Sequence, residues 1–415
     1  MKLLVIADDF TGALDSGVQF SSRNIKVQII VHSIDSLSEI PADAEVLVVD
    51  AETRHLPASE AYGCVYQIAK AALASDFTHI YKKTDSALRG NVGAELTAVL
   101  EAAGAAKMPF LPAFPKLNRT TRGGIQYVDG TPVAESVFGR DPFEPVTNSR
   151  VPEIIHQGSS QPVVLHPLGA DLAMDRPGIH VYDAEAQENL KQIGAALGPD
   201  GIRISAGCAG FASEIADILF PHSKQIGHRV APGKSQMLFV ACGSVNDVTI
   251  RQMEEAEKAG FVHIHLSAEQ KLDPLWPGSD AMHQAVQQWL PIASKRNFIL
   301  DVNDPPGGQD TPQYAAAHKL TKGQMRERIS HNLGAAVESL LDNGLNNLLL
   351  CTGGDTLLAL MKQVRTNTLT PVGELIPGIV MTNFSYAGQN YNMITKSGGF
   401  GTPDLFVQIA KIVGG

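Results

Sequence analysis

The stretch Leu3-Leu4-Val5-Ile6-Ala7-Asp8-Asp9-Phe10-Thr11-Gly12 determines how the rest of the chain is interpreted. Its apolar half predicts a buried strand, and the residues after Gly12 have the character of a helix. In an open α/β sheet, ligands bind just beyond the carboxyl ends of the strands. Asp8 and Asp9 are therefore expected at a ligand site, where a carboxylate can hold hydroxyl groups, hold a metal or accept a proton. A single aspartate here could simply cap the helix; two of them, followed by Thr-Gly, favour a site.

Apolar, β-branched runs alternate with helical stretches along most of the chain. Expected strands are residues 27–31, 46–49, 78–81, 237–242, 298–302 and 348–351, and expected helices are 58–73, 92–103, 247–259, 282–288, 325–343, 357–363 and 404–413. This alternation predicts mainly parallel sheets covered by helices. A chain of 415 residues is expected to form two domains. The polar, Pro- and Gly-containing segment 221–236 is the best boundary. We therefore expect an α/β protein with two α/β domains, residues 1–228 and 229–415, and an active-site cleft between them.

The middle of the chain has a different character. Residues 112–177 are rich in Pro, Gly, Asn and Arg and show weak periodicity. Long stretches without regular structure inside a domain are usually functional, so we expect this region to form walls around a substrate site. Lys116, Arg119 and Arg122 belong either to such a wall or to a solvated loop.

Composition and charge exclude several classes of function. The net charge is -10 and no long basic block occurs, which argues against nucleic-acid binding. No apolar run reaches the roughly 18 residues of a membrane span, and the N-terminus lacks a signal-peptide pattern, so a cytoplasmic protein is expected. The four cysteines form no Cys-x-x-Cys pair and are interpreted as core residues. His263 and His265 share one face of an expected strand; without an evident third ligand, we expect them to face solvent.

A second motif follows the expected strand 78–81. It reads Lys82-Lys83-Thr84-Asp85-Ser86-Ala87-Leu88-Arg89-Gly90-Asn91. Cations suit the carboxylate of a polyhydroxy acid, and the Asp and Ser side chains suit its hydroxyl groups. Arg54 follows the strand 46–49 and could clamp a carboxylate through two parallel hydrogen bonds. The alternative is a solvated turn with chance charges.

Three strand–glycine–helix segments mark the second half of the chain. They contain Gly243-Ser244, Thr352-Gly353-Gly354-Asp355-Thr356 and Lys396-Ser397-Gly398-Gly399-Phe400-Gly401. Backbone N–H groups at a helix N-terminus bind phosphate, and three such loops in one domain predict a nucleotide-phosphate site. Asp355 could cap its helix or help hold Mg²⁺. Residues 227–235 resemble a P-loop, but they have one residue too many between the glycines and precede a strand, so they are expected to be linker.

Taken together, these motifs resemble those of the four-carbon acid sugar kinases. The matching text is Ile6–Ala13, Lys82–Asn91, Gly243-Ser244, Thr352–Thr356 and Lys396–Gly401, in family order over nearly the whole chain. The resemblance implies an N-terminal sugar-acid domain, a C-terminal nucleotide domain, and ATP with Mg²⁺. It implies phosphoryl transfer to the terminal hydroxyl of a tetronate. The Lys82–Ser86 text resembles the branch acting on D-threonate or D-erythronate more than the 3-oxo-tetronate branch, and D-threonate is the leading substrate.

The resemblance also implies which residues act. The sugar acid would be bound by Asp9, Arg54, Lys82, Lys83, Thr84 and Asp85, and the nucleotide by Ser244, Gly353, Gly354, Asp355, Thr356 and Gly399. An aspartate must accept or orient the hydroxyl proton; we expect Asp9 first and Asp85 second, because both stand at strand ends beside cations. The two lobes should close over residues 221–236 to exclude water.

Several alternatives remain at this point. A D-erythronate kinase, a 3-oxo-tetronate kinase or a kinase of a longer aldonate would use the same kind of site. A non-catalytic sensor of nucleotide and sugar acid, or an ATP-dependent ligase, would belong to a different class. Neither nucleic acid nor a membrane is expected as a partner, and a homodimer is the commonest assembly of soluble enzymes.

Overall fold

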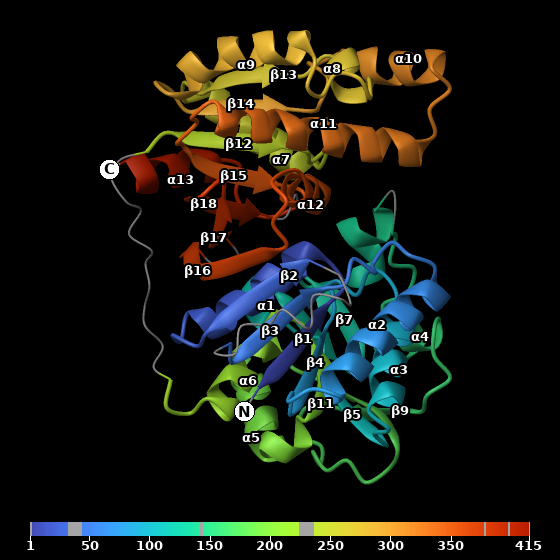
Figure 1. Ribbon diagram of the computed structural model, residues 1–415. Coiled ribbons are helices and arrows are strands. Elements are labelled where there is room, and N and C mark those ends of the chain that lie inside the picture. Colours follow the sequence, from blue (N-terminus) through green and yellow to red (C-terminus); the bar gives the residue numbers. More distant parts are fainter. Residues whose placement is uncertain are drawn as a thin grey trace. The chain divides into compact units, whose positions relative to one another are not determined.

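The computed structural model describes residues 2–31, 44–141, 144–223, 236–376, 379–396 and 399–414. The chain folds as two compact units, Met1–Gly227 and His228–Gly415 (Figure 1). Strands alternate with helices in each unit, so the expected α/β class with mainly parallel sheets is confirmed. Most of the expected linker, 221–236, and the P-loop-like segment 227–235 lie outside the described residues.

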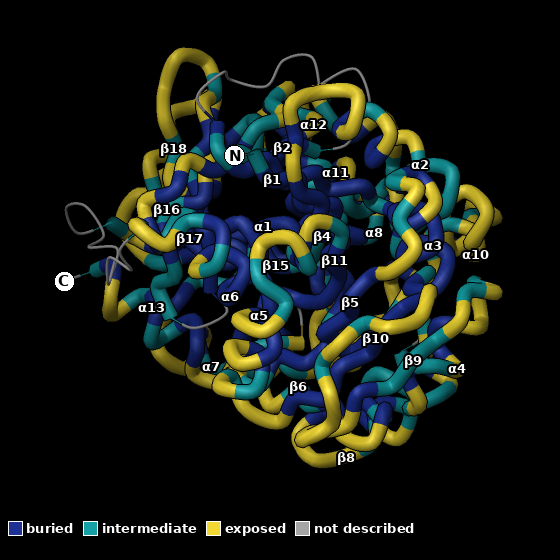
Figure 2. Tube along the Cα trace, turned by 90° about the horizontal axis from the view of Figure 1, so that it is seen from below, coloured by how far each residue is buried: buried dark blue, intermediate teal, exposed yellow. Residues whose placement is uncertain are grey.

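The first unit is built on a parallel sheet. Its strand order is β2 (Val27–Val31), β3 (Val46–Asp50), β1 (Leu3–Ala7), β4 (His79–Lys83), β11 (Ile204–Gly207), β5 (Lys107–Leu111), β10 (Gly178–Tyr182) and β9 (Val163–His166). Strands β1, β3 and β4 are buried along their whole length, as Figure 2 shows for β1 and β4. Because β1 lies between β3 and β4, the loops that leave these three strands meet where the strand order reverses, which is the usual ligand position in such sheets.

Helices cover both faces of this sheet. They are α1 (Phe10–Ser21), α2 (Ala58–Leu73), α3 (Val92–Ala102), α4 (Val151–His156), α5 (Gln187–Gly201) and α6 (Ala209–Leu219). Leu4 and Ile6 pack in a core cluster with residues of α2 and α3. Leu3 and Val5 point to the opposite face, since side chains alternate along a strand, and they are equally buried.

The middle region contains more regular structure than its sequence suggested. The strands β6 (Arg119–Arg122), β7 (Ile125–Val128) and β8 (Thr131–Pro132) form a small antiparallel sheet, and η2 (Pro115–Leu117), η3 (Val133–Glu135) and η4 (Val137–Arg140) are 3₁₀ turns. The expectation of a long stretch without regular structure was therefore wrong. Strands this short span too few residues for periodicity to reveal them.

The second unit also has a mostly parallel sheet. Its order is β13 (Val262–His265), β14 (Phe298–Asp301), β12 (Leu238–Cys242), β15 (Leu348–Thr352), β18 (Gln389–Lys396), β17 (Ile379–Tyr386) and β16 (Thr368–Ile376), with β17 antiparallel to both of its neighbours in this order. The register aligns Asp301, Cys242, Thr352 and Lys396 on four adjacent strands. The loops that follow these strands therefore start at the same level of one sheet edge.

The helices of this unit are α7 (Asp247–Lys258), α8 (Ala268–Leu272), α9 (Asp280–Ala293), α10 (Asp310–Ala317), α11 (Lys322–Asp342), α12 (Gly354–Gln363) and α13 (Leu405–Gly414). Expected helices agree within a few residues, except that α9 is longer than 282–288 because Trp289 and Ala293 continue its buried stripe. No described helix is both long enough and apolar enough to cross a membrane. Of the cysteines, all free, only Cys64 is not fully buried.

Candidate functional site

Asp8 and Asp9 follow β1 and bind the same arginine. Arg54 Nε donates to Asp8 Oδ2 at 2.7 Å, and Arg54 Nη1 donates to Asp9 Oδ2 at 2.6 Å. Asp9 Oδ1 accepts from the Gly12 backbone N–H at 2.8 Å and so caps α1. The capping and site interpretations of this motif are therefore compatible, because one carboxylate does both.

The loop that carries Arg54 is held in place from two sides. Asn91 Nδ2 donates to the carbonyl oxygens of Thr53 at 2.9 Å and Leu56 at 2.8 Å. The backbone N–H groups of Thr53 and Arg54 donate to the Asp8 carbonyl at 3.0 and 3.1 Å. The guanidinium is thus fixed at the switch point before any ligand arrives.

Two buried carboxyls near this arginine have pKa values shifted in opposite directions. Asp8 is buried, which by itself raises its pKa, but the charges of Arg54, Lys82 and Lys83 outweigh this and hold the pKa below its usual value. The Asp8 Oδ1 atom is buried and has no hydrogen-bond partner among the described residues. Asp50 ends β3, and burial beside Glu52 raises its pKa well above the usual range, which favours the protonated form. Asp50 was not singled out from the sequence, although its place beside the end of β1 was a signal.

The two lysines of β4 point to opposite faces, because side chains alternate along a strand. Lys82 Nζ lies 2.8 Å from Glu95 Oε2 of α3, and it donates to the Ile6 carbonyl at 3.2 Å and the Lys83 carbonyl at 2.7 Å. The side chains of Lys82 and Glu95 are 0% and 2% exposed. An ammonium has three N–H donors, and here all three are engaged. Lys82 was expected to bind the sugar acid, and in this geometry it has no free donor for one.

Lys83 reaches the face that carries the aspartates. A Cβ placed on Gly12 would lie 2.8 Å from Lys83 Nζ and 2.7 Å from Asp9 Oδ1, so any other residue at this position would displace these two charged groups. Lys83 is buried, and within the described ranges its ammonium has no hydrogen-bond or ion-pair partner. Its charge nevertheless acts on Asp8 and Asp85. Lys83 is thus a cation available to an anionic ligand.

Asp85 is anchored by arginine. Its Oδ2 accepts from Arg89 Nε at 2.8 Å and its Oδ1 from Arg89 Nη2 at 3.2 Å, while Arg54 Nη2 lies 3.8 Å from Oδ1. Burial raises the pKa of Asp85, but the charges of Arg89 and Arg54 outweigh it and hold the pKa well below its usual range. Thr84 is buried and turned away, since its N–H and hydroxyl both donate to the Gly207 carbonyl. Of this motif, Lys83 and Asp85 face the aspartates, and Lys82 and Thr84 support the strand.

Part of the middle region covers Arg89. The Phe138 ring centroid lies 5.0 Å from the Arg89 guanidinium carbon and 5.4 Å from that of Arg119. Asp141 Oδ2 lies 3.4 Å from Arg89 Nη1. Arg122, in contrast, is exposed and stacks on Tyr127. Arg119 therefore belongs to the wall of this site, whereas Arg122 belongs to the solvated surface.

In the second unit, the three predicted glycine loops converge. A Cβ on Gly353 would lie 3.5 Å from the Gly243 carbonyl carbon and 3.6 Å from the Ser244 nitrogen, and one on Gly399 would lie 3.5 Å from Asn246 Nδ2. The φ of Gly353 is 102°, a conformation that favours glycine. The loops after β12 and β15 thus bring backbone groups together near helix N-termini, and Gly399, after β18, lies beside the Asn246 side chain that caps α7.

Asp355 has a partner that the sequence did not reveal. It lies in the first turn of α12, and Arg326 of α11 donates to its two oxygens, from Nε at 2.6 Å and Nη2 at 2.7 Å. Their side chains are 39% and 40% exposed. Asp355 therefore neither caps the helix nor presents a free carboxylate, and it could hold Mg²⁺ only after Arg326 moved away. Arg326 lay inside a helical pattern, where an exposed arginine carries no functional signal.

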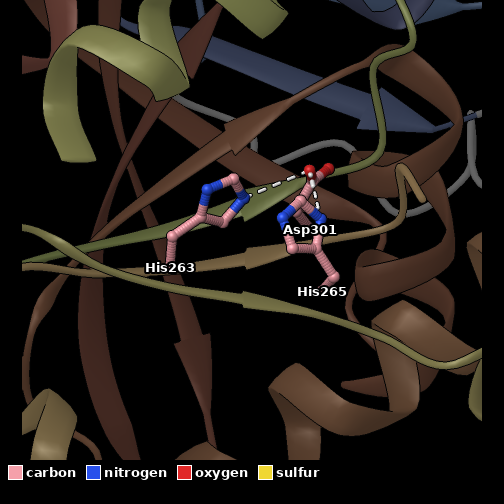
Figure 3. Close-up of side chains that lie close together, drawn as sticks. All are labelled: His263, His265 and Asp301. Atoms are coloured by element: carbon pink, nitrogen blue, oxygen red, sulfur yellow. Dashed lines mark hydrogen bonds and ion pairs between the residues drawn. The ribbon is translucent and has the colours of Figure 1, made fainter. Parts of the chain in front are cut away.

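Two further charged groups flank these loops. Lys396 ends β18, donates to Thr249 Oγ1 at 3.1 Å, and has its pKa lowered to about 7 by burial. His263 and His265 face Asp301 rather than solvent (Figure 3). The expectation of solvent-facing imidazoles was therefore wrong, because it considered only β13 and not the neighbouring strand.

Comparison with known proteins agrees with this division of the chain. A family model described as a sugar-binding N-terminal domain matches residues 3–215, and one described as a nucleotide-binding C-terminal domain matches residues 239–406. The D-threonate kinase of Salmonella typhimurium is 30% identical over 97% of this chain and 96% of its own length. The D-erythronate kinase of Heliobacterium modesticaldum is 26% identical, over 91% of this chain and 88% of its own.

The fold has a counterpart among solved structures as well. A Salmonella typhimurium LT2 protein, described as a candidate tRNA synthase, superposes with a TM-score of 0.78 over 98% of both chains. At 20% identity, this likeness concerns the fold alone.

Proposed function

The chain belongs to the four-carbon acid sugar kinase family, and from this premise we propose that it transfers the γ-phosphoryl group of ATP to the 4-hydroxyl of D-threonate. Membership makes the protein a kinase of four-carbon acid sugars. The choice of D-threonate is supported by the D-threonate kinase from Salmonella typhimurium and by the Lys82–Ser86 motif. The product would be 4-phospho-D-threonate.

One observation carries the assignment of the sugar-acid site to the first unit. Lys83 presents an ammonium without a described partner next to Asp8 and Asp9, which Arg54 holds at the sheet's switch point. A polyhydroxy acid offers a carboxylate to Lys83 and hydroxyl donors to the aspartates. The unpartnered Asp8 Oδ1 is a buried acceptor, and an unsatisfied buried acceptor gains most from a ligand hydroxyl.

We assign the proton-accepting role to Asp9 rather than Asp85. Asp9 is partly exposed and lies beside Lys83, so a substrate hydroxyl can reach it. The charges of Arg89 and Arg54 hold the pKa of Asp85 well below its usual range, which makes it a weak base. Phosphoryl transfer depends mostly on positioning and charge neutralisation, so Asp9 would chiefly orient the hydroxyl.

We assign the ATP phosphates to the loops that carry Ser244, Gly353 and Gly399. The convergence of these loops supports this choice, because backbone N–H groups at helix N-termini favour anions. Arg326 supplies a guanidinium beside the same loops. Mg²⁺ would enter with the nucleotide, since it is usually held by substrate phosphates and one or two carboxylates.

The proposal is tested by ADP release with ATP and Mg²⁺ against D- and L-threonate, D- and L-erythronate and the 3-oxo-tetronates. We expect the highest kcat/KM with D-threonate and, by ³¹P NMR, a phosphate on the 4-carbon. A kcat/KM at least tenfold higher for D-erythronate or a 3-oxo-tetronate would overturn the choice of substrate. Absence of turnover with every four-carbon acid would overturn the proposal as a whole.

A further inference from the structure

A cluster of three potential metal ligands lies on the two outer strands of the second unit's sheet. His263 and His265 project from the same face of β13, and Asp301 ends the neighbouring strand β14 (Figure 3). Their ligand atoms all lie within 4.8 Å of one another, and this is the one such group found among the described residues. Neither the nucleotide site nor the sugar-acid site uses these side chains.

The spacing of the ligand atoms suits a single small ion. His263 Nε2 lies 3.2 Å from Asp301 Oδ2, and His265 Nδ1 lies 3.4 Å from the same oxygen. Bonds of about 2.0–2.1 Å to a tetrahedral Zn²⁺ place neighbouring ligand atoms about 3.4 Å apart. The three side chains could therefore bind one ion with small rotations and no movement of the strands.

The surroundings orient these ligands. The Asn303 backbone N–H and Nδ2 donate to Asp301 Oδ1 at 3.0 and 2.8 Å, which turns Oδ2 toward the imidazoles. Glu257 Oε2 lies 3.7 Å from His263 Nδ1, on the far side of that ring from Asp301. A carboxylate behind a histidine is the usual outer support of a metal-bound imidazole. The side chains of Asp301 and His263 are 1% and 8% exposed, and that of His265 is 24% exposed, so one side stays open for a solvent ligand.

In the structure, the two imidazoles are themselves the hydrogen-bond partners of Asp301 Oδ2. Both imidazoles converge on one oxygen of Asp301, and their ring centroids are 4.1 Å apart. His265 Nδ1 also lies 2.9 Å from the Asn303 carbonyl, so a proton on that nitrogen must leave before it can bind a metal. Metal binding releases such protons as a matter of course.

From this geometry we propose that His263, His265 and Asp301 form a binding site for a divalent transition metal of the Zn²⁺ class. Two imidazoles and one carboxylate favour zinc and its first-row neighbours, whereas Mg²⁺ prefers oxygen ligands. The ion is therefore distinct from any Mg²⁺ that accompanies ATP. It would join β13 to β14, and Asn303 Nδ2 connects it to the Ser244 carbonyl at 3.0 Å.

The test measures binding of Zn²⁺ alone to the full chain by isothermal titration calorimetry, without nucleotide or sugar acid. We expect one site in the wild type that His263→Gln weakens at least about 100-fold, because loss of a mere outer-shell partner already costs 10- to 100-fold. His283→Gln is the matched control, since His283 is exposed on α9; its affinity should stay within twofold of wild type. Equal Zn²⁺ affinity and stoichiometry in the wild type and His263→Gln would overturn the proposal, as would a wild type that binds no Zn²⁺ at micromolar concentrations.

A second measurement guards against a variant that fails to fold. His265→Gln changes the most exposed ligand and should leave the circular dichroism spectrum intact. Co²⁺ should give the wild type a visible d–d absorption that this variant lacks, and Zn²⁺ should raise the Tm of the wild type but not of the variant. The same Co²⁺ spectrum in both proteins would refute the assignment. Neither readout depends on kinase activity, so this proposal fails or stands independently of the proposed function.

Discussion

Replacing Lys82 by Met should destabilise the first unit rather than weaken its binding of the sugar acid. Lys82 and Glu95 form a fully buried pair with Nζ and Oε2 2.8 Å apart, and Lys82 also donates to two backbone carbonyls. Removing one partner of a buried pair leaves an uncompensated charge and costs about 3–5 kcal/mol. For a unit of this size, that corresponds to a fall in Tm of roughly 10 °C.

The double variant Lys82→Met/Glu95→Leu isolates the cause of this loss. Replacing both partners of a buried pair by apolar groups is often neutral, so we expect most of the stability to return. In the single variant the deficit should shrink from pH 7 to pH 5. Burial raises the pKa of Glu95, and the charge of Lys82 is the largest opposing influence. Without Lys82 the carboxyl therefore takes up a proton more readily, and the folded state gains stability as the pH falls.

Urea unfolding followed by circular dichroism measures these differences, and steady-state kinetics separates them from ligand binding. Lys83→Met is the matched control at the neighbouring position. The Lys83 ammonium makes no ion pair among the described residues, so its loss should change the free energy of unfolding by less than about 1 kcal/mol. The KM for the sugar acid should instead rise. A Lys82→Met protein with wild-type stability and only a raised KM would refute the reasoning and restore Lys82 as a direct ligand of the substrate.

Three further predictions concern the sites themselves. Asp9→Asn should lower kcat by about 10²–10⁴-fold while sugar-acid binding is largely retained, as measured by ADP release and calorimetry. Asp175 is exposed, so the control Asp175→Asn should behave as wild type. A kcat near wild type for Asp9→Asn would contradict the assignment. Gly12→Ala should lower kcat/KM, because the new Cβ would crowd Asp9 and Lys83. Gly63→Ala, in α2 with nothing near its Cβ, should instead stabilise the protein by about 0.5–1 kcal/mol. Thermal unfolding and steady-state kinetics of both variants test these two expectations. Burial lowers the pKa of Lys396 to about 7, below its unfolded value, so the contribution of this side chain to stability should rise by about 3 kcal/mol from pH 7 to pH 10. The difference in unfolding free energy between the wild type and Lys396→Met, measured in urea, should grow by that amount.

Much of the fold followed from periodicity, and the limits of that approach are physical. The segments 58–73 and 27–31 were predicted with the bounds that α2 and β2 have, because apolar residues recur every three to four positions in the first and fill all but one position, Gln28, of the second. β4 was expected to end at Tyr81 because two lysines follow. It continues to Lys83, since Glu95 neutralises Lys82 from a helix that no local pattern connects with it.

The candidate sites show the same limit. Strand ends were located well enough to place Asp9, Arg54 and the three glycine loops just after the carboxyl ends of strands, where the structure has them. Which side chain faces the ligand depends on the phase of alternation within a strand, and a two-residue error in the end of β4 hid the difference between Lys82 and Lys83. Pairings such as Arg326 with Asp355, or His263 with Asp301, join segments far apart in the chain, so neither segment alone carries a signal.

The hydrogen bonds that Arg54 makes with Asp8 and Asp9 affect how this site would discriminate among acids. Arg54 Nε and Nη1 already donate to Asp8 and Asp9. An acid whose carboxylate turned from Lys83 to these two donors would leave the aspartates without them. For a simple acid such as acetate, this swap of partners gains little. An acid with adjacent hydroxyl groups can return donors to both aspartates in the same step, so that every group keeps a hydrogen bond. Under the proposed function, selection would then act on the pattern of hydroxyls along the carbon chain more than on negative charge, and an abundant unhydroxylated acid would compete poorly even in large excess.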